Sequence, residues 1–174
     1  MPKKELSRPD QIEHWLIGMG DQLHETGEIT LIGSGAILWH AFQKGVNTPL
    51  PENSMDVDPI TESEEVASIC YDCLIGSEFE QREGWHVNLM PKSVLQKLPP
   101  GWKDRTHLKQ YGKLHVTVPS IPDLLAPKLE RGEPRDKKHV EYANTLPGNE
   151  PNQGTPKPIA RKPKTEGPSD PSDP

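Results

Sequence analysis

Two short motifs contain the residues that are best suited to chemistry. In "LIGSG", Gly33 and Ser34 follow an apolar run. In "MDVDPI", Asp56 and Asp58 are separated by a single valine. A glycine-serine turn in front of a helix offers free backbone N–H groups to an anion such as a phosphate. Paired carboxylates offer the oxygen ligands that Mg²⁺ prefers, so the two motifs together predict a site for a phosphate and a metal.

Each motif also has an explanation that involves no ligand. Residues i and i+2 of a strand point to the same face, so Asp56 and Asp58 project side by side and repel each other unless a cation lies between them. At a solvated strand end, however, two acids are tolerated. The turn at Gly33 lacks the Gly-Lys-Ser/Thr ending of a Walker A loop and the third glycine of a dinucleotide-binding loop. It is therefore either a phosphate-binding turn or an ordinary link between a strand and a helix.

The elements that must position these motifs alternate between helices and strands. Apolar spacing and turn residues predict helices over 10–23, 34–42, 62–75, 120–130 and 134–146, and strands over 28–33, 55–60, 85–90 and 113–118. Pro59 predicts that its strand lies at an edge or ends there, and Pro127 predicts a kink or a break in its helix. Ser120 is the expected N-cap of that helix. This order predicts a small α/β domain with a mixed sheet flanked by helices.

The end of the chain has a different composition. Residues 148–174 contain seven prolines, three glycines and no aromatic residue. Such a stretch cannot bury enough apolar surface to offset the entropy of ordering, so we expect a disordered tail. Its four basic and four acidic residues cancel, and the net charge of −6 belongs to residues 1–147, the expected folded domain.

Composition also bears on the compartment. No apolar run approaches the ~20 residues of a membrane span, and the N-terminus lacks an apolar signal core. We therefore expect a cytoplasmic protein that does not enter a membrane. Cys70 and Cys73 form a lone C-x-x-C, without the second pair or the histidines of a zinc site. They are expected to be two reduced, buried thiols on one face of a helix.

In combination, the glycine-serine turn and the Asp-x-Asp pair resemble the signature of the polymerase-beta-like nucleotidyltransferase superfamily. The stretch "SIPDLLAPKLERGEPRDKKHVEYA" is similar to the C-terminal part of small stand-alone bacterial members, including AbiEii-like toxin nucleotidyltransferases. The resemblance runs from about Glu28 to Leu146. It implies a nucleotidyltransferase fold.

The resemblance also implies roles for individual residues. A nucleoside triphosphate (NTP) would bind at Gly33, Ser34 and Lys128, and a lysine suits this place because its point charge matches a triphosphate. Mg²⁺ would bind at Asp56 and Asp58. The catalytic set implied by the resemblance is Asp56, Asp58 and Asp136. The acceptor of the nucleotide would be the end of a tRNA or a protein side chain, and toxin relatives imply a cognate partner protein.

The chain departs from the family pattern in two places. The first is the spacing, because 21 residues separate Ser34 from Asp56, more than is usual, and the loop "KGVNTPLPENS" accounts for the excess. The second is the third carboxylate that the family often carries on the next core strand. Here "WHVNLM" offers Asn88 or His86 instead. An amide can ligate a hard cation, but it cannot take up a proton as a general base.

Two functions are weighed from the sequence, and an antitoxin-like or regulatory component is a third possibility that the sequence does not separate from them. One is a Mg²⁺-dependent transfer of a nucleoside monophosphate from an NTP to RNA or protein, in a toxin-antitoxin setting. The other is a catalytically degenerate module of the same fold that binds a nucleotide or a partner protein, which Asn88 favours. The net acidity of the folded region argues against a broad basic surface for RNA.

Overall fold

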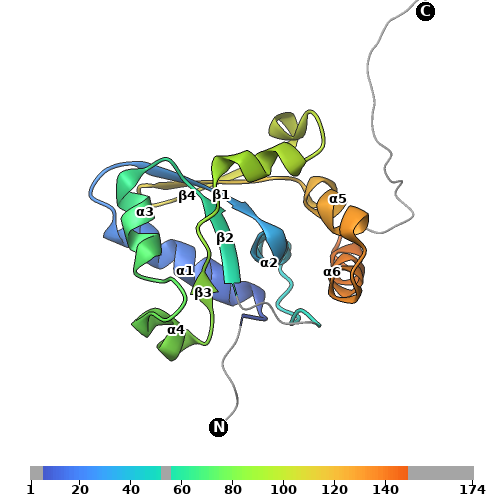
Figure 1. The fold of residues 1–174 in the computed structure, drawn as a ribbon, viewed down its shortest axis with the longest axis horizontal. Coiled ribbons are helices and arrows are strands. Elements are labelled where there is room, and N and C mark those ends of the chain that lie inside the picture. Colours follow the sequence, from blue (N-terminus) through green and yellow to red (C-terminus); the bar gives the residue numbers. More distant parts are fainter. Residues whose placement is uncertain (1–5, 52–55, 149–174) are drawn as a thin grey trace, which may run out of the picture.

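The computed structural model describes residues 6–51 and 56–148, so the tail that is expected to be disordered lies, except for Gly148, outside the described residues. A five-stranded mixed sheet with the order β3-β2-β1-β5-β4 forms the centre (Figure 1). Its strands are β1 (Gly27–Ile32), β2 (Asp56–Ile60), β3 (His86–Val87), β4 (His107–Tyr111) and β5 (Leu114–Val118). The expected mixed α/β class is confirmed.

The helices surround this sheet. They are α1 (Pro9–Gln22), α2 (Gly33–Gln43), α3 (Glu64–Tyr71), α4 (Glu78–Glu83), α5 (Ile121–Arg131) and α6 (Pro134–Asn144), with short 3₁₀ helices at Lys92–Lys97 and Trp102–Arg105. Helices α5 and α6 lie side by side at one end of the molecule, and α3 and α4 lie at the other end (Figure 1). No helix in the part of the chain that the structure describes is long and apolar enough to cross a membrane.

Strand β1 holds the sheet together because it is paired on both sides. It runs antiparallel to β2, with Ile32 opposite Asp58, and parallel to β5, with Ile29 opposite Val116. Alternate residues of β1, including Ile29 and Leu31, are fully buried. Helix α2 follows β1 without a linker, and eight of its eleven residues are buried. The turn between β1 and α2 is therefore fixed by packing on both of its sides.

The structure differs from the predicted elements where hydrophobic periodicity is weak. Strand β4 was not expected, because only Tyr111 among its five residues is buried and no alternation marks it. The helix expected over 62–75 is shorter, since Ser63 caps its start and it ends at Tyr71. Helix α4, which buries no residue, was also not expected. The strand expected over 85–90 is reduced to two residues.

The two prolines behave differently from each other. Strand β2 is not an edge strand, but it ends one residue after Pro59. The Pro59 carbonyl accepts a hydrogen bond from the Met90 N–H at 2.9 Å, on the side of β2 that faces away from β1. The nitrogen of a strand residue faces the same side as its carbonyl, so the N–H that Pro59 lacks would not have bonded to β1. The pairing of β2 with β1 therefore loses no hydrogen bond. A kink or a break was expected at Pro127, and the break is wrong, because α5 continues across it. Only one helical hydrogen bond is lost there, and α5 has buried residues on both sides of Pro127, including Leu124, Leu125 and Lys128.

The two cysteines are free and buried, as expected. Cys70 belongs to α3, and Cys73 follows the end of that helix. Burial raises the pKa of the Cys70 thiol to about 12, which keeps it protonated and unreactive at neutral pH.

Two glycines of α1 provide a matched test of this packing. A Cβ at Gly20 would lie 2.0 Å from the backbone oxygen of Tyr111, whereas a Cβ at Gly18 would meet nothing within 4 Å. We expect Gly20→Ala to lower the free energy of unfolding by about 2 kcal/mol through overpacking. Gly18→Ala is expected to raise it by about 0.5–1 kcal/mol through helix propensity. Urea denaturation of both variants checks this, and equal effects would show that α1 does not press on the β4–β5 hairpin.

Candidate functional site

The two motifs meet at the junction of β1 and α2. Because Asp58 lies opposite Ile32 in the sheet, its side chain reaches the first residue of α2. Gly33 has a φ of +75°, and a Cβ at this position would lie 2.6 Å from Asp58 Oδ2. Both the left-handed backbone and the approach of the carboxylate require glycine here. Ser34 follows in the first turn of α2 and is 7% exposed.

The carboxylates of β2 share one face of the sheet. Val57, between them, is fully buried, while Asp56 and Asp58 are partly exposed on the opposite face. A Cβ at Gly35 would contact Val57, so the buried face of β2 packs against α2. The alternation inferred from the sequence therefore places both carboxylates together.

The third position beside these acids is taken by Asn88. Asp56 is opposite His86 in the parallel pairing of β2 and β3, so Asn88 follows at the level of Asp58. Asn88 Nδ2 donates a hydrogen bond to Asp58 Oδ1 at 3.3 Å. His86 instead contacts Glu80, with 2.8 Å between its Nδ1 and Oε2 of the glutamate. Of the two candidates left by the sequence, it is Asn88 whose side chain contacts the acidic pair.

The pKa of Asp58 reports how its surroundings act on the acidic pair. Burial, together with the negative charge of Asp56, raises the pKa of Asp58 to about 6. The hydrogen bond from Asn88 and the positive charge of Lys128 oppose this rise only in part. A cation placed between the two carboxylates would therefore be attracted strongly and would lower the pKa of Asp58.

Lys128 of α5 lies close enough to this pair to act on its pKa, although it comes from the far end of the chain. It is 8% exposed, and its Nζ lies 3.7 Å from Asp136 Oδ1 and 3.3 Å from His139 Nδ1. Burial lowers the pKa of Lys128, and the charge of Asp136 opposes this. A buried ammonium group with one close carboxylate is suited to receive a second anion, such as a phosphate.

Asp136 lies at the start of α6 and is 2% exposed. Arg131 donates two hydrogen bonds to it, from Nε at 2.7 Å and from Nη2 at 2.6 Å. These bonds lower the pKa of Asp136 to about 2. The structure thus brings Lys128 and Asp136 together, and Asp136 forms ion pairs with both Lys128 and Arg131. The sequence did not reveal the Arg131 contact, since it depends on how α5 and α6 turn at Gly132.

Comparison with known families finds a match over most of the chain. A model of the family described as "Nucleotidyltransferase of unknown function (DUF6036)" matches residues 10–146. The chain belongs to this family. The match includes every candidate residue of the site, from Gly33 to Asp136. Comparisons with the curated proteins and with the solved structures found no match. The nucleotidyltransferase family expected from the motifs is therefore confirmed at this level.

In this nucleotidyltransferase, the donor set determines which metal the site could hold. No group of three or more His, Cys, Asp or Glu residues suited to a metal occurs within residues 6–51 and 56–148. Asp56 and Asp58 with the amide of Asn88 are hard oxygen donors of the kind that bind Mg²⁺, which retains waters or takes oxygens from a substrate phosphate. The residues present fit Mg²⁺ together with a phosphate better than a metal held by protein alone.

Proposed function

We propose that this protein transfers a nucleoside monophosphate from an NTP to a hydroxyl group of RNA or protein. The observation that supports this proposal is the contact between the two motifs. Because Gly33 has no side chain, the Asp58 carboxylate can lie beside the N-terminus of α2. A phosphate held at that N-terminus would lie next to the metal-binding carboxylates. This juxtaposition is what metal-assisted phosphoryl chemistry requires.

Each residue then has a separate task. Asp56 and Asp58 would hold Mg²⁺, which when bound neutralises the charge that develops on the phosphate oxygens. Ser34 and the backbone N–H groups at the start of α2 hold the β- and γ-phosphates. Lys128 adds a positive charge to the triphosphate. Asp136 is a positioning residue, because it acts through Lys128, which it orients and keeps charged.

The reaction forms one bond and breaks one bond. The oxygen of the acceptor hydroxyl attacks the α-phosphorus, the bond from this phosphorus to the bridging oxygen breaks, and pyrophosphate leaves. Asn88 cannot accept the hydroxyl proton. The proton therefore passes to solvent water or to the departing pyrophosphate, and slow turnover is expected because no third carboxylate assists.

The resemblance to AbiEii-like toxins supports a finer proposal about the acceptor. In that setting, the acceptor is the end of a tRNA or a protein side chain, and a cognate partner protein restrains the activity. Because the net charge of −6 belongs to residues 1–147, a nucleic acid acceptor would have to bind at a local basic region rather than over the whole surface.

A second function is favoured by one observation, the amide of Asn88 at the third position. A protein of this fold that binds an NTP and Mg²⁺ without transferring a nucleotide would act as a nucleotide-dependent binding module. This alternative shares the binding residues with the enzyme and differs only in the proton transfer.

Incubation with each α-labelled NTP, Mg²⁺ and total cellular RNA or protein tests the transfer. We expect label on a macromolecule with one or more of the NTPs, and no label when Asp56 and Asp58 are both changed to Asn. Asn88→Asp provides a matched comparison, since it restores a third carboxylate and is expected to increase the rate. If the parent binds NTP and neither it nor Asn88→Asp labels any acceptor, the binding module is the correct function.

A further inference from the structure

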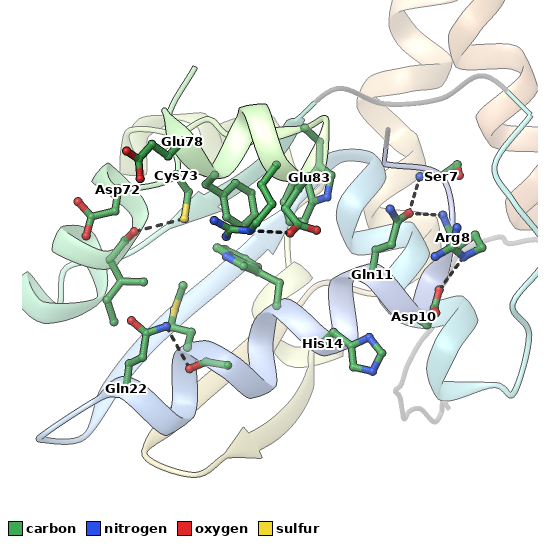
Figure 2. Close-up of a pocket in the computed structure, with 17 residues that line it drawn as sticks. Ser7, Arg8, Asp10, Gln11, His14, Gln22, Asp72, Cys73, Glu78 and Glu83 are labelled. Carbon is green, nitrogen blue, oxygen red and sulfur yellow. Dashed lines mark hydrogen bonds and ion pairs between the residues drawn. The ribbon is translucent and has the colours of Figure 1, made fainter. Parts of the chain in front are cut away.

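A groove of about 1000 Å³ runs along α1 (Figure 2). Ser7, Arg8 and Asp10 lie at one end of it, and Asp72 and Glu78 lie at the other (Figure 2). The proposed function uses none of the residues that line this groove.

The groove contains an aromatic cluster. The rings of Trp15 and Trp85 meet edge to face with 6.1 Å between their centroids, and Phe79 meets Trp85 in the same way at 4.8 Å. Trp85 is buried, whereas Trp15 and Phe79 are only partly covered. Grooves lined by aromatic rings are the surfaces on which proline-rich, extended segments dock in other proteins.

The charges of the groove are unequal. Four carboxylates line it against two guanidinium groups. Arg8 pairs with Asp10 at 3.1 Å, and Arg82 pairs with Glu83 at 3.0 Å. Asp72 and Glu78 are exposed and make no salt bridge within the described part of the chain. A segment lying in the groove would therefore be favoured if it carried cations at the Asp72 end.

The chain itself contains a segment of this chemistry. Residues 156–164 read "PKPIARKPK", with three prolines, four basic residues, one isoleucine and no acid. Prolines favour the extended polyproline conformation, which loses little entropy on binding. A low apolar content does not prevent such a segment from binding to a preformed surface.

The end of the described chain lies within reach of the groove. A Cβ at Gly148 would lie 3.7 Å from Lys44 Nζ. The loop that follows Lys44 contacts the start of α1, where Asn47 Oδ1 accepts a hydrogen bond from the Asp10 N–H at 3.0 Å. From Gly148 to Arg161 an extended chain spans roughly 40 Å at ~3.1 Å per residue. The stretch of α1 along the groove, 8–22, is only about 21 Å long.

We propose that residues 156–164 dock in the groove along α1, with Arg161 and Lys162 at the end formed by Asp72 and Glu78. The segment lies on the aromatic rings with its prolines and Ile159. This contact is independent of the proposed function, because it involves neither the nucleotide nor the metal residues. It gives the tail a binding surface on its own domain.

Carbodiimide cross-linking of the full chain at low protein concentration tests this docking, because the reagent joins a lysine to a carboxylate only where they touch. We expect cross-links in the monomer from Lys162 and Lys164 to Asp72 and Glu78, located by peptide mass spectrometry. Glu62 and Glu64 are the internal control, since they are exposed acids that line a separate depression around α3. Their cross-links to the same lysines are expected to be rare.

A tail variant separates docking from charge attraction. Pro156→Gly, Pro158→Gly and Ile159→Ser together keep every lysine but remove the apolar contacts. Cross-links to Asp72 and Glu78 are expected to fall roughly tenfold, the order of effect of removing one buried aliphatic side chain. Unchanged cross-linking in this variant, equal yields at Glu62 and Glu64, or cross-links found only in dimers would each overturn the proposal.

Discussion

Changing both Asp56 and Asp58 to asparagine is expected to make the metal-free protein more stable and to remove its response to Mg²⁺ and NTP. In the folded protein the pKa of Asp58 is raised from 3.8 to about 6. One pKa unit corresponds to about 1.4 kcal/mol, so ionised Asp58 lowers the free energy of unfolding by about 2–3 kcal/mol at pH 7. The double variant should regain most of this, which is a rise of roughly 5–10 °C in Tm.

The pH dependence of this effect has a definite sign. A carboxyl group whose pKa is higher in the folded state than in the unfolded state stabilises the fold below the unfolded pKa and loses this contribution as pH rises. The stability of the parent should therefore fall between about pH 4 and pH 6 through this group, and the variant should lack this fall. Thermal denaturation from pH 4 to pH 8 without metal measures it.

The same experiment with ligands reports on the site. Mg²⁺ with a non-hydrolysable NTP should raise the Tm of the parent and not that of the double variant, because only the folded protein binds the ligand. A double variant that is less stable than the parent in the absence of metal would contradict the assignment of Asp58 as a destabilising acid.

Arg131→Ala is expected to be the most destabilising of these changes. It removes the bidentate hydrogen bonds from Arg131 to the carboxylate of Asp136, which is 2% exposed. Breaking a buried ion pair from one side costs about 3–5 kcal/mol, and we expect the lower value because the Arg131 side chain is itself 52% exposed. The Tm should fall by roughly 10 °C.

The pH dependence of the destabilisation by Arg131→Ala follows from the pKa of Asp136. The pKa of Asp136 is lowered to about 2 in the parent, so its pairing stabilises the fold above the unfolded pKa of 3.8 and is lost as pH falls toward 2. The difference between parent and Arg131→Ala should therefore shrink below pH 4. Adding Asp136→Asn should recover part of the loss at pH 7. Arg135→Ala is the matched control, since this neighbouring arginine is exposed, and a similar loss from both variants would show that the Asp136 pair is not special.

Arg131 also connects stability to function. Asp136 lies 3.7 Å from Lys128, so a displaced Asp136 no longer orients the ammonium group that faces the acidic pair. At a temperature where the variant is folded, NTP should bind more weakly to Arg131→Ala than to Arg135→Ala.

The adjacency of the two motifs could be inferred from sequence because it is local. A short apolar strand, a glycine turn and a helix in direct succession place Gly33 and Ser34 at a helix start, and the next strand brings Asp56 and Asp58 beside it. Choosing between His86 and Asn88 was not possible, since it needs the register of β3 against β2. That register depends on tertiary pairing rather than on residue type.

Other features depend on contacts that leave no pattern in the sequence. Strand β4 is largely exposed, so no alternation of apolar residues marks it. The bidentate ion pair between Arg131 and Asp136 forms because Gly132, with a φ of +69°, turns α6 back onto α5. The groove along α1 joins Trp15 to Trp85, which are 70 positions apart in the chain.

We propose that Gly33, Asp56 and Asp58 form one site for Mg²⁺ and an NTP. Isothermal titration calorimetry of a non-hydrolysable NTP into the full chain, with and without Mg²⁺, tests it most directly. We predict binding that requires Mg²⁺, Mg²⁺ binding that is weak unless the nucleotide is present, and loss of both in the Asp56→Asn, Asp58→Asn double variant. Nucleotide binding of equal affinity in the parent and the double variant would contradict the account.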